Sequence, residues 1–321
     1  MRHLAILLLL AVFLALGGAM RVHRFDPAPI IHARPVPLDR DRPDLRQVGR
    51  LTFVAGWSLS SREADMGGIS SMSIVGRRVT TLSDRGTVIA FDVPTGGLAG
   101  DARLSPLPET PGDRTYKGGR DSESMTIDRA TGRLWVGFEG ANAIWRYGAG
   151  LATSEGGTAP PQMADWSSNS GPEAIVRLPD GRFLVFAEGK RGPRGGREAL
   201  LFAGDPSRKG MRAIRFEYRP PEGYRPTEAA LLPDGQVLLL NRRASLRDGV
   251  SAVIERIDPA RIRPGQIVPA ERIARIAPPL IVDNLEAMAV TRERGRTMLW
   301  IASDDNFLFF QRTLLLKFAL D

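Results

Sequence analysis

The chain has 321 residues, a net charge of +8 and no cysteine. It therefore has no disulfide, thiol nucleophile or thiolate zinc ligand, and its stability must come from a large core. Its histidines are His3, His23 and His32, all ahead of the repeated units described below, which excludes a Ser-His-Asp centre or a histidine zinc site in those units. The sequence shows no interleaving of aromatic and basic residues, so we expect no nucleic-acid partner.

Residues 1–19 have the order of a secretory signal peptide. Arg2 precedes an apolar run from Leu4 to Leu16, and the small residues Gly17, Gly18 and Ala19 follow. We predict cleavage after this segment and a periplasmic or secreted protein. The alternative is an uncleaved anchor that keeps the domain at a membrane, although a spanning helix takes about 20 apolar residues.

Residues 20–48 are rich in Pro, Arg and Asp and show little apolar periodicity. Such a segment buries little surface, so we predict a tether or a wrapped arm. The remaining residues, 49–321, are numerous enough for one all-β domain, which we expect to be a monomer.

Four stretches of this domain resemble one another, and each contains a glutamate. They are Ser122–Met125, Pro172–Ile175, Thr227–Ala230 and Leu285–Met288, with glutamates 50, 55 and 58 residues apart. An apolar run, a turn and a second apolar run follow each. The stretch Gly67–Met72 fits the same template with Ser70 in place of the glutamate. A period of this length indicates stacked or radially arranged units.

The third unit illustrates the expected local structure. Ala174–Leu178 and Phe183–Ala187 are β-favouring runs joined by Pro179-Asp180-Gly181, which predicts a hairpin. Each unit has room for two further strands, so we predict a β-propeller of four-stranded antiparallel blades, with five blades counted and six as the alternative. The last unit has only three strands, and the run Arg50–Val54 is expected to supply the fourth and close the ring.

Blade geometry predicts where the acids lie. In antiparallel neighbours the start of the first strand and the end of the second lie at the same edge, so both sets converge on one mouth of the channel. Carboxylates held together share protons or bind a hard cation, for which calcium is the best candidate. The alternative is that each glutamate binds backbone amides of the next blade. The first set is Glu123, Glu173, Glu228 and Glu286, and the second is Asp84, Glu139, Glu188, Asn241 and Asp304.

Basic residues follow several of these second strands. Guanidinium groups beside a cation could bind phosphate oxygens bidentately, although exposed loops of so arginine-rich a chain would look similar. No nucleophile elbow, dinucleotide loop or P-loop is present. The basic candidates for substrate binding are Arg85, Lys190, Arg242 and Arg312.

Together these motifs resemble the phytase-like family described as having "esterase-like activity of phytase". The resemblance covers residues 49–321, and it implies an exported propeller with hydrolytic, phosphodiesterase-like activity. It departs from the family at Ser70 and at Asn241-Arg242, where other units carry acids. The motifs lie at 67–72, 82–86, 121–125, 171–175, 283–288 and 303–307. The resemblance assigns its acidic motif positions to Asp84, Glu123, Glu173, Glu228, Glu286, Asp304 and Asn306.

These observations predict an exported, metal-dependent hydrolase acting on a small anionic or ester substrate, most of all a phosphate ester. The alternatives are a non-enzymatic binding propeller with a structural ion and a lactonase-like hydrolase. The expected roles are cation binding for Glu123, Glu173, Glu228 and Glu286, proton transfer for Asp84, Asp304, Glu139 and Glu188, and substrate binding for Arg85, Lys190, Arg242, Arg312 and Asn306.

Overall fold

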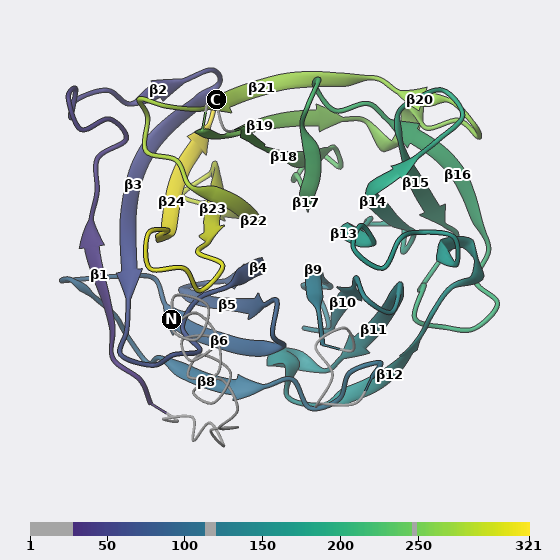
Figure 1. Ribbon diagram of the computed structural model, residues 1–321, viewed down its shortest axis with the longest axis horizontal. Helices are drawn as coiled ribbons and strands as arrows, with labels where there is room; N and C mark the ends of the chain where they lie inside the picture. The colour runs from purple at the N-terminus through teal and green to yellow at the C-terminus, as the bar shows by residue number, and fades with distance from the viewer. Residues whose placement is uncertain (1–27, 113–119, 246–248) are drawn as a thin grey trace, which may run out of the picture.

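The structure is a computed structural model and describes residues 28–112, 120–245 and 249–321. In these ranges the strands form five sheets around a common axis, with β4, β9, β13, β17 and β22 nearest that axis (Figure 1). The predicted all-β propeller of four-stranded antiparallel blades is confirmed. The helices of these ranges are single 3-10 turns: η2 (Ala149–Leu151), η3 (Pro161–Met163) and η4 (Pro259–Arg261).

We number the sheets from first to fifth in the chain order of their inner strands. The first contains β4 (Ile69–Val75), β5 (Arg78–Ser83), β6 (Thr87–Asp92) and β8 (Arg103–Pro106), and the second β9 (Ser122–Ile127), β10 (Leu134–Phe138), β11 (Ala143–Tyr147) and β12 (Ser154–Thr158). The third contains β13 (Pro172–Arg177), β14 (Phe183–Arg191), β15 (Arg197–Phe202) and β16 (Ala213–Tyr218), joined by β20 (Ile267–Val268) in parallel. The fourth contains β17 (Arg225–Leu231), β18 (Val237–Ser245), β19 (Gly249–Ile257) and β21 (Ala270–Ile276).

The fifth sheet joins the two ends of the described chain. It contains β22 (Asn284–Glu293), β23 (Arg296–Asp304) and β24 (Thr313–Leu320), and β3 (Leu51–Ser60) pairs with β24 along its length. Trp57 of β3 stacks on Trp300 of β23, with ring centroids 6.4 Å apart. The predicted N-terminal closing strand is therefore confirmed, and it continues beyond Val54.

The segment predicted as an arm or tether is partly a strand. β1 (Ile31–Pro35) pairs with β3 and with β7 (Leu98–Ala99), and β2 (Gln47–Val48) also pairs with β3. Ile31 and Ala33 alternate with exposed neighbours and are buried, which gives β1 the apolar face a strand needs. No helix in the described ranges is long and apolar enough to cross a bilayer. The predicted signal peptide lies outside the described residues.

The core is a series of apolar layers between neighbouring sheets. Leu238 and Ile254 of the fourth sheet, for example, pack with Leu299 and Phe318 of the fifth, and four similar clusters fill the other intersheet spaces. Each such side chain contributes roughly 1.5–3 kcal/mol on burial. The packing holds the inner strands at fixed positions around the axis.

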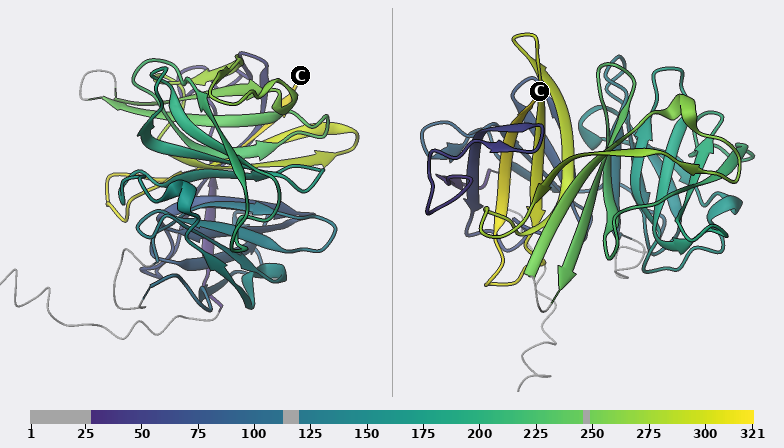
Figure 2. Two further views of the ribbon diagram at one scale, coloured as in Figure 1. Left: turned by 90° about the vertical axis from the view of Figure 1, so that its right-hand side faces the viewer. Right: turned by 90° about the horizontal axis from the view of Figure 1, so that it is seen from above.

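The predicted Asp-Gly turns lie opposite the strand ends that carry the acids. Gly181 and Gly235 adopt φ of 86° and 85°, the left-handed conformation that favours glycine in such turns. In the left view of Figure 2 the yellow-green β22–β23 hairpin projects to one side, and the yellow loop between β23 and β24 projects to the other. We call the face with that loop the mouth face.

Candidate functional site

Each inner strand contains a β-bulge near its start. In the third sheet Pro172 pairs with Ala187 and Ala174 with Phe186, which leaves Glu173 as the extra residue. A bulge re-aims the side chain of its extra residue and is frequent beside functional sites. The bulged residues of the five sheets are Ser70, Glu123, Glu173, Thr227 and Glu286. Three of the four predicted glutamates thus share one structural position.

Glu228 does not occupy this position, so its predicted place in the ring is corrected. The register makes Thr227 the bulged residue of β17, and Glu228 pairs with Leu240. Its side chain is fully buried, and one carboxyl oxygen accepts a hydrogen bond from the Ala229 N–H at 2.9 Å. Burial raises the pKa of Glu228 well above its usual range, which favours the neutral carboxyl.

The same register places Arg242, rather than Asn241, level with the acids of the other second strands. In β14 the residue after the partner of Pro172 is Glu188, and in β18 the residue after the partner of Pro226 is Arg242. Asn241 is itself fully buried. At this position the fourth sheet therefore has the positively charged side chain of Arg242, whereas the other four sheets have a carboxylate.

The bulged glutamates meet the acids of the second strands at the mouth. Glu123, for example, is repelled by Glu173 and Glu286, which belong to two other sheets. Asp304 is repelled by Glu286 and Asp84. We call the acids linked in this way the carboxylate cluster: Asp84, Asp121, Glu123, Glu139, Glu173, Glu188, Glu286 and Asp304.

Burial and mutual repulsion make this cluster hold protons. Burial, followed by repulsion from neighbouring carboxylates, raises the pKa of Glu123 and Glu173 well above the usual range. The same causes raise the pKa of Glu139 to about 7 and that of Asp304 to about 8. A hydrogen bond between the carboxyls of Glu139 and Glu173 counters the rise for Glu139 and adds to it for Glu173. Protons or a cation must therefore neutralise the cluster at neutral pH.

Part of the cluster fits a metal ion. Asp121, Glu123 and Glu139 each offer a carboxylate oxygen, and these oxygens lie within 4.8 Å of one another. An all-oxygen donor set suits a hard cation, calcium above all. Asp121 was missed as a candidate, although it stands two residues before Glu123 in the same motif.

Arg242 is a fixed positive charge among these acids. Its Nε lies 3.2 Å from Glu286 Oε1, one terminal nitrogen lies 3.6 Å from Glu188 Oε1, and the other donates to Asn284 Oδ1 at 2.8 Å. Burial opposes its charge, but four carboxylates together raise the pKa of Arg242, namely those of Glu286, Glu188, Glu173 and Asp304. Burial raises the pKa of Glu286, and the guanidinium of Arg242 counters part of that rise by favouring the ionised carboxylate.

The other predicted substrate-binding side chains contact partners outside the cluster or at its edge. Lys190 pairs with Asp165 at 2.8 Å, Arg312 pairs with Asp283 at 3.2 Å, and the Arg85 guanidinium lies 3.5 Å from the centre of the Phe307 ring. The Asn306 N–H donates to Asp304 Oδ1 at 2.6 Å. These contacts order the loops of the rim, and only Arg242 among the predicted cations forms ion pairs with the cluster.

The alternative role predicted for the bulged residues is hydrogen bonding to the backbone of the next sheet. This role is observed in the first sheet, where Ser70 replaces the glutamate. The Ser70 hydroxyl donates to the Ser122 carbonyl of the second sheet at 2.5 Å, and the Ser122 hydroxyl donates to the Ser83 carbonyl at 2.8 Å. The first and second sheets are therefore tied at the bulge by neutral hydroxyl groups.

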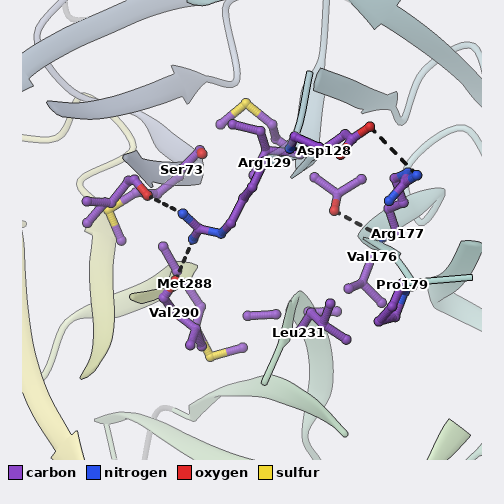
Figure 3. Close-up of a pocket in the computed structure, with 18 residues that line it drawn as sticks. Ser73, Asp128, Arg129, Val176, Arg177, Pro179, Leu231, Met288 and Val290 are labelled. Carbon is purple, nitrogen blue, oxygen red and sulfur yellow. Dashed lines mark hydrogen bonds and ion pairs between the residues drawn. The ribbon is translucent and has the colours of Figure 1, made fainter. Parts of the chain in front are cut away.

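The far end of the channel holds a different cavity, of about 250 Å³. Arg129 extends across it and donates to the carbonyls of Ile74 at 3.1 Å and Val290 at 2.6 Å (Figure 3). Its lining is largely apolar, and the acid that lines it, Asp128, lies 3.7 Å from Arg177. The groups needed for acid–base or cation chemistry are at the mouth, so the carboxylate cluster is the candidate site.

Solved structures with a similar chain course include the glutaminyl cyclase of Myxococcus xanthus, at 12% identity and a TM-score of 0.48 over 86% of this chain and 100% of that one. A luciferin-regenerating enzyme gives 11% identity and a TM-score of 0.44 over 90% and 95% of the two chains. A protein described as a putative gluconolactonase gives 13% and 0.41 over 90% and 99%. At these values the likenesses carry no functional argument.

No curated protein matches the sequence. Residues 64–307 match the family described as "Phytase-like: Esterase-like activity of phytase". The match spans all five inner strands and the whole carboxylate cluster. The chain therefore belongs to the phytase-like family, as its motifs predicted.

Proposed function

We propose that this protein is a divalent-cation-dependent hydrolase of ester bonds, with phosphate esters as its preferred substrates. The observation that carries the proposal is the carboxylate cluster, in which four of the five sheets contribute acids to one mouth. Strongly perturbed pKa values at a mouth are typical of functional sites. Membership of a family described by esterase-like activity supports the same reaction class.

Asp121, Glu123 and Glu139 are the residues that would hold the cation, because their oxygens already lie within 4.8 Å of one another. Glu173, hydrogen-bonded to Glu139, would complete or orient this set. A bound cation supplies positive charge that neutralises these carboxylates and polarises the ester. Calcium is the ion that best matches several carboxylates without histidine or cysteine.

Asp304 and Asp84 are the proposed proton carriers. A carboxyl with a pKa of about 8 holds its proton at pH 7, and proton transfer is most efficient when the pKa lies near the working pH. Asp304 then donates to the leaving oxygen, while Asp84 accepts the proton of the attacking water. Burial raises the pKa of Glu286, and the ion pair with Arg242 opposes that rise. The charge of Arg242 also favours an anionic substrate.

Chelation tests the reaction. We expect hydrolysis of bis(p-nitrophenyl) phosphate and p-nitrophenyl acetate to fall by about 100-fold in EGTA, because a bound cation supplies several kcal/mol of charge stabilisation. Added calcium should restore it. Turnover that is the same with and without chelator would rule out this function.

A matched pair of variants separates the cluster from the rest of the inner strands. We expect Glu123→Gln to lose hydrolysis and to bind calcium more weakly in calorimetry. Glu228→Gln changes a buried carboxyl outside the cluster, so this variant should retain both hydrolysis and calcium binding. If the parent protein shows no hydrolysis and Glu123→Gln only lowers the melting temperature, a non-enzymatic binding propeller with a structural ion is the better description.

We also propose that the protein is exported. The support is the order of charge, apolar run and small residues in 1–19. N-terminal sequencing of the protein from a periplasmic or secreted fraction should begin at Met20. Recovery in the membrane fraction with Met1 retained would instead support the uncleaved anchor.

A further inference from the structure

A second cavity, of about 430 Å³, lies at the mouth face between the third and fourth sheets. It is formed by the connection from β14 to β15 and the connection from β16 to β17, and both include the strand ends nearest the mouth. Its lining includes four arginines, Arg191, Arg197, Arg219 and Arg225, and one acidic residue, Glu222. The cavity is therefore strongly cationic, although it adjoins an acidic site.

Three of these arginines bind backbone carbonyls within the described part of the chain. Arg197 donates to the Gly189 carbonyl at 2.7 Å, Arg219 to the Arg194 carbonyl at 2.6 Å, and Arg191 to the Gly195 carbonyl at 3.4 Å. A carbonyl orients a guanidinium but does not neutralise it. Arg225 differs, because it pairs with Glu188 of the carboxylate cluster at 2.9 Å.

Two of the arginines occupy paired positions on neighbouring strands. Arg191 of β14 pairs directly with Arg197 of β15, and like charges in opposed positions destabilise a sheet. Burial, then repulsion from Arg191 and Arg225, lowers the pKa of Arg197. An anion seated between these side chains would remove the repulsion.

The loop that carries the facing arginines is rigidly held. The two carboxylate oxygens of buried Glu217 accept hydrogen bonds from the N–H groups of Arg194 and Gly196, each at 2.8 Å. A Cβ on Gly192 would lie 2.4 Å from Glu217 Cδ, so only glycine fits there. The backbone that carries Arg191 and Arg197 is thus ordered before any ligand arrives, which reduces the entropic cost of binding.

We propose that this arginine cavity binds the phosphate group of a soluble small molecule. Guanidinium forks match the oxygens of a phosphate dianion and bind it bidentately. The site is separate from the carboxylate cluster and joined to it through the Arg225–Glu188 pair. It does not depend on the hydrolase function, because binding here needs neither cation nor turnover.

The test uses inorganic pyrophosphate titrated calorimetrically into the full chain, in EGTA and at low salt. We expect the double variant Arg191→Gln/Arg219→Gln to bind pyrophosphate at least about 100-fold more weakly, because it loses two charge-assisted contacts. Both side chains are exposed, so folding should be unaffected. Arg191→Lys/Arg219→Lys, which keeps the charge but loses the fork, should fall between. Arg292→Gln, exposed near the β22–β23 turn on the opposite face, is the control and should bind as the parent does.

Unchanged pyrophosphate affinity in the double glutamine variant would overturn the proposal. Vesicles containing phosphatidylglycerol form a second arm of the experiment. Binding to vesicles that depends on Arg191 and Arg219, with no binding of pyrophosphate, would also overturn it and identify a lipid headgroup as the ligand. Because all measurements are made in EGTA, loss of hydrolysis in chelator and failure of this site are separate results.

Discussion

In chelator, the melting temperature of this protein should fall as the pH rises from 5 to 8.5, and calcium should reverse most of that fall. The pKa values of Glu139 and Asp304, about 7 and about 8, lie above those of the unfolded chain. The folded state therefore binds more protons than the unfolded state between about pH 4 and pH 8. The stability contributed by these protons is fully present below about pH 4, declines as the pH rises from there, and is gone above the folded-state pKa values.

A cation replaces the lost protons, so its effect should be small at pH 5 and large at pH 8. We expect a calcium-dependent rise of at least about 5 °C at pH 8, since each kcal/mol shifts the melting temperature of a domain of this size by about 2 °C. Circular dichroism melts over this pH range, in EGTA and in calcium, measure it. Glu228→Gln is the control. The buried carboxyl of Glu228 lies outside the carboxylate cluster, so this variant should show the same effect of calcium on the melting temperature as the parent. Equal melting temperatures with and without calcium at pH 8 would contradict a cation site.

Replacing Arg242 by methionine should destabilise the metal-free protein by about 3 kcal/mol at pH 8, because breaking one side of a buried ion pair leaves the partner charge uncompensated. Arg242 pairs with Glu286 at 3.2 Å and faces Glu188 at 3.6 Å. Burial raises the pKa of Glu286, so this carboxylate takes up a proton more readily at pH 5, and the loss should be smaller there. Urea unfolding at the two pH values measures both.

The matched control is Arg256→Met in the adjacent strand of the same sheet. Arg256 pairs with Glu271 at 2.5 Å, but the Glu271 side chain is 45% exposed, and exposed pairs contribute little. If Arg242→Met is no more destabilising than Arg256→Met, then Arg242 is not the counter-charge of the cluster.

The departures from the repeat give the cluster its asymmetry. The first sheet has Ser70 and the fourth has Thr227 at the bulge, so the fully acidic positions belong to the second, third and fifth sheets. The three acids that fit a metal ion, Asp121, Glu123 and Glu139, belong to the second sheet. Arg242 instead lies beside Glu188 of the third sheet and Glu286 of the fifth. One mouth can therefore hold a cation at one side and a fixed positive charge at the other.

The sequence by itself determined the repeat, the all-β propeller and its closure by an N-terminal strand. These follow from apolar runs and turn residues, whose local preferences agree with the fold. It also predicted that Glu123, Glu173 and Glu286 meet the acids that end the second strands, because strand direction alone places both sets at one edge.

Only the tertiary structure decided which residues of the fourth sheet face the site. A bulge adds one residue to a strand, and a shift of one residue sends a side chain to the other face. Thr227 and Glu228, or Asn241 and Arg242, are adjacent in sequence, and no local pattern says which is bulged. Packing between sheets settles that choice. It also pairs Lys190 with Asp165 and Arg312 with Asp283, contacts between residues too far apart in the chain for any local motif to indicate.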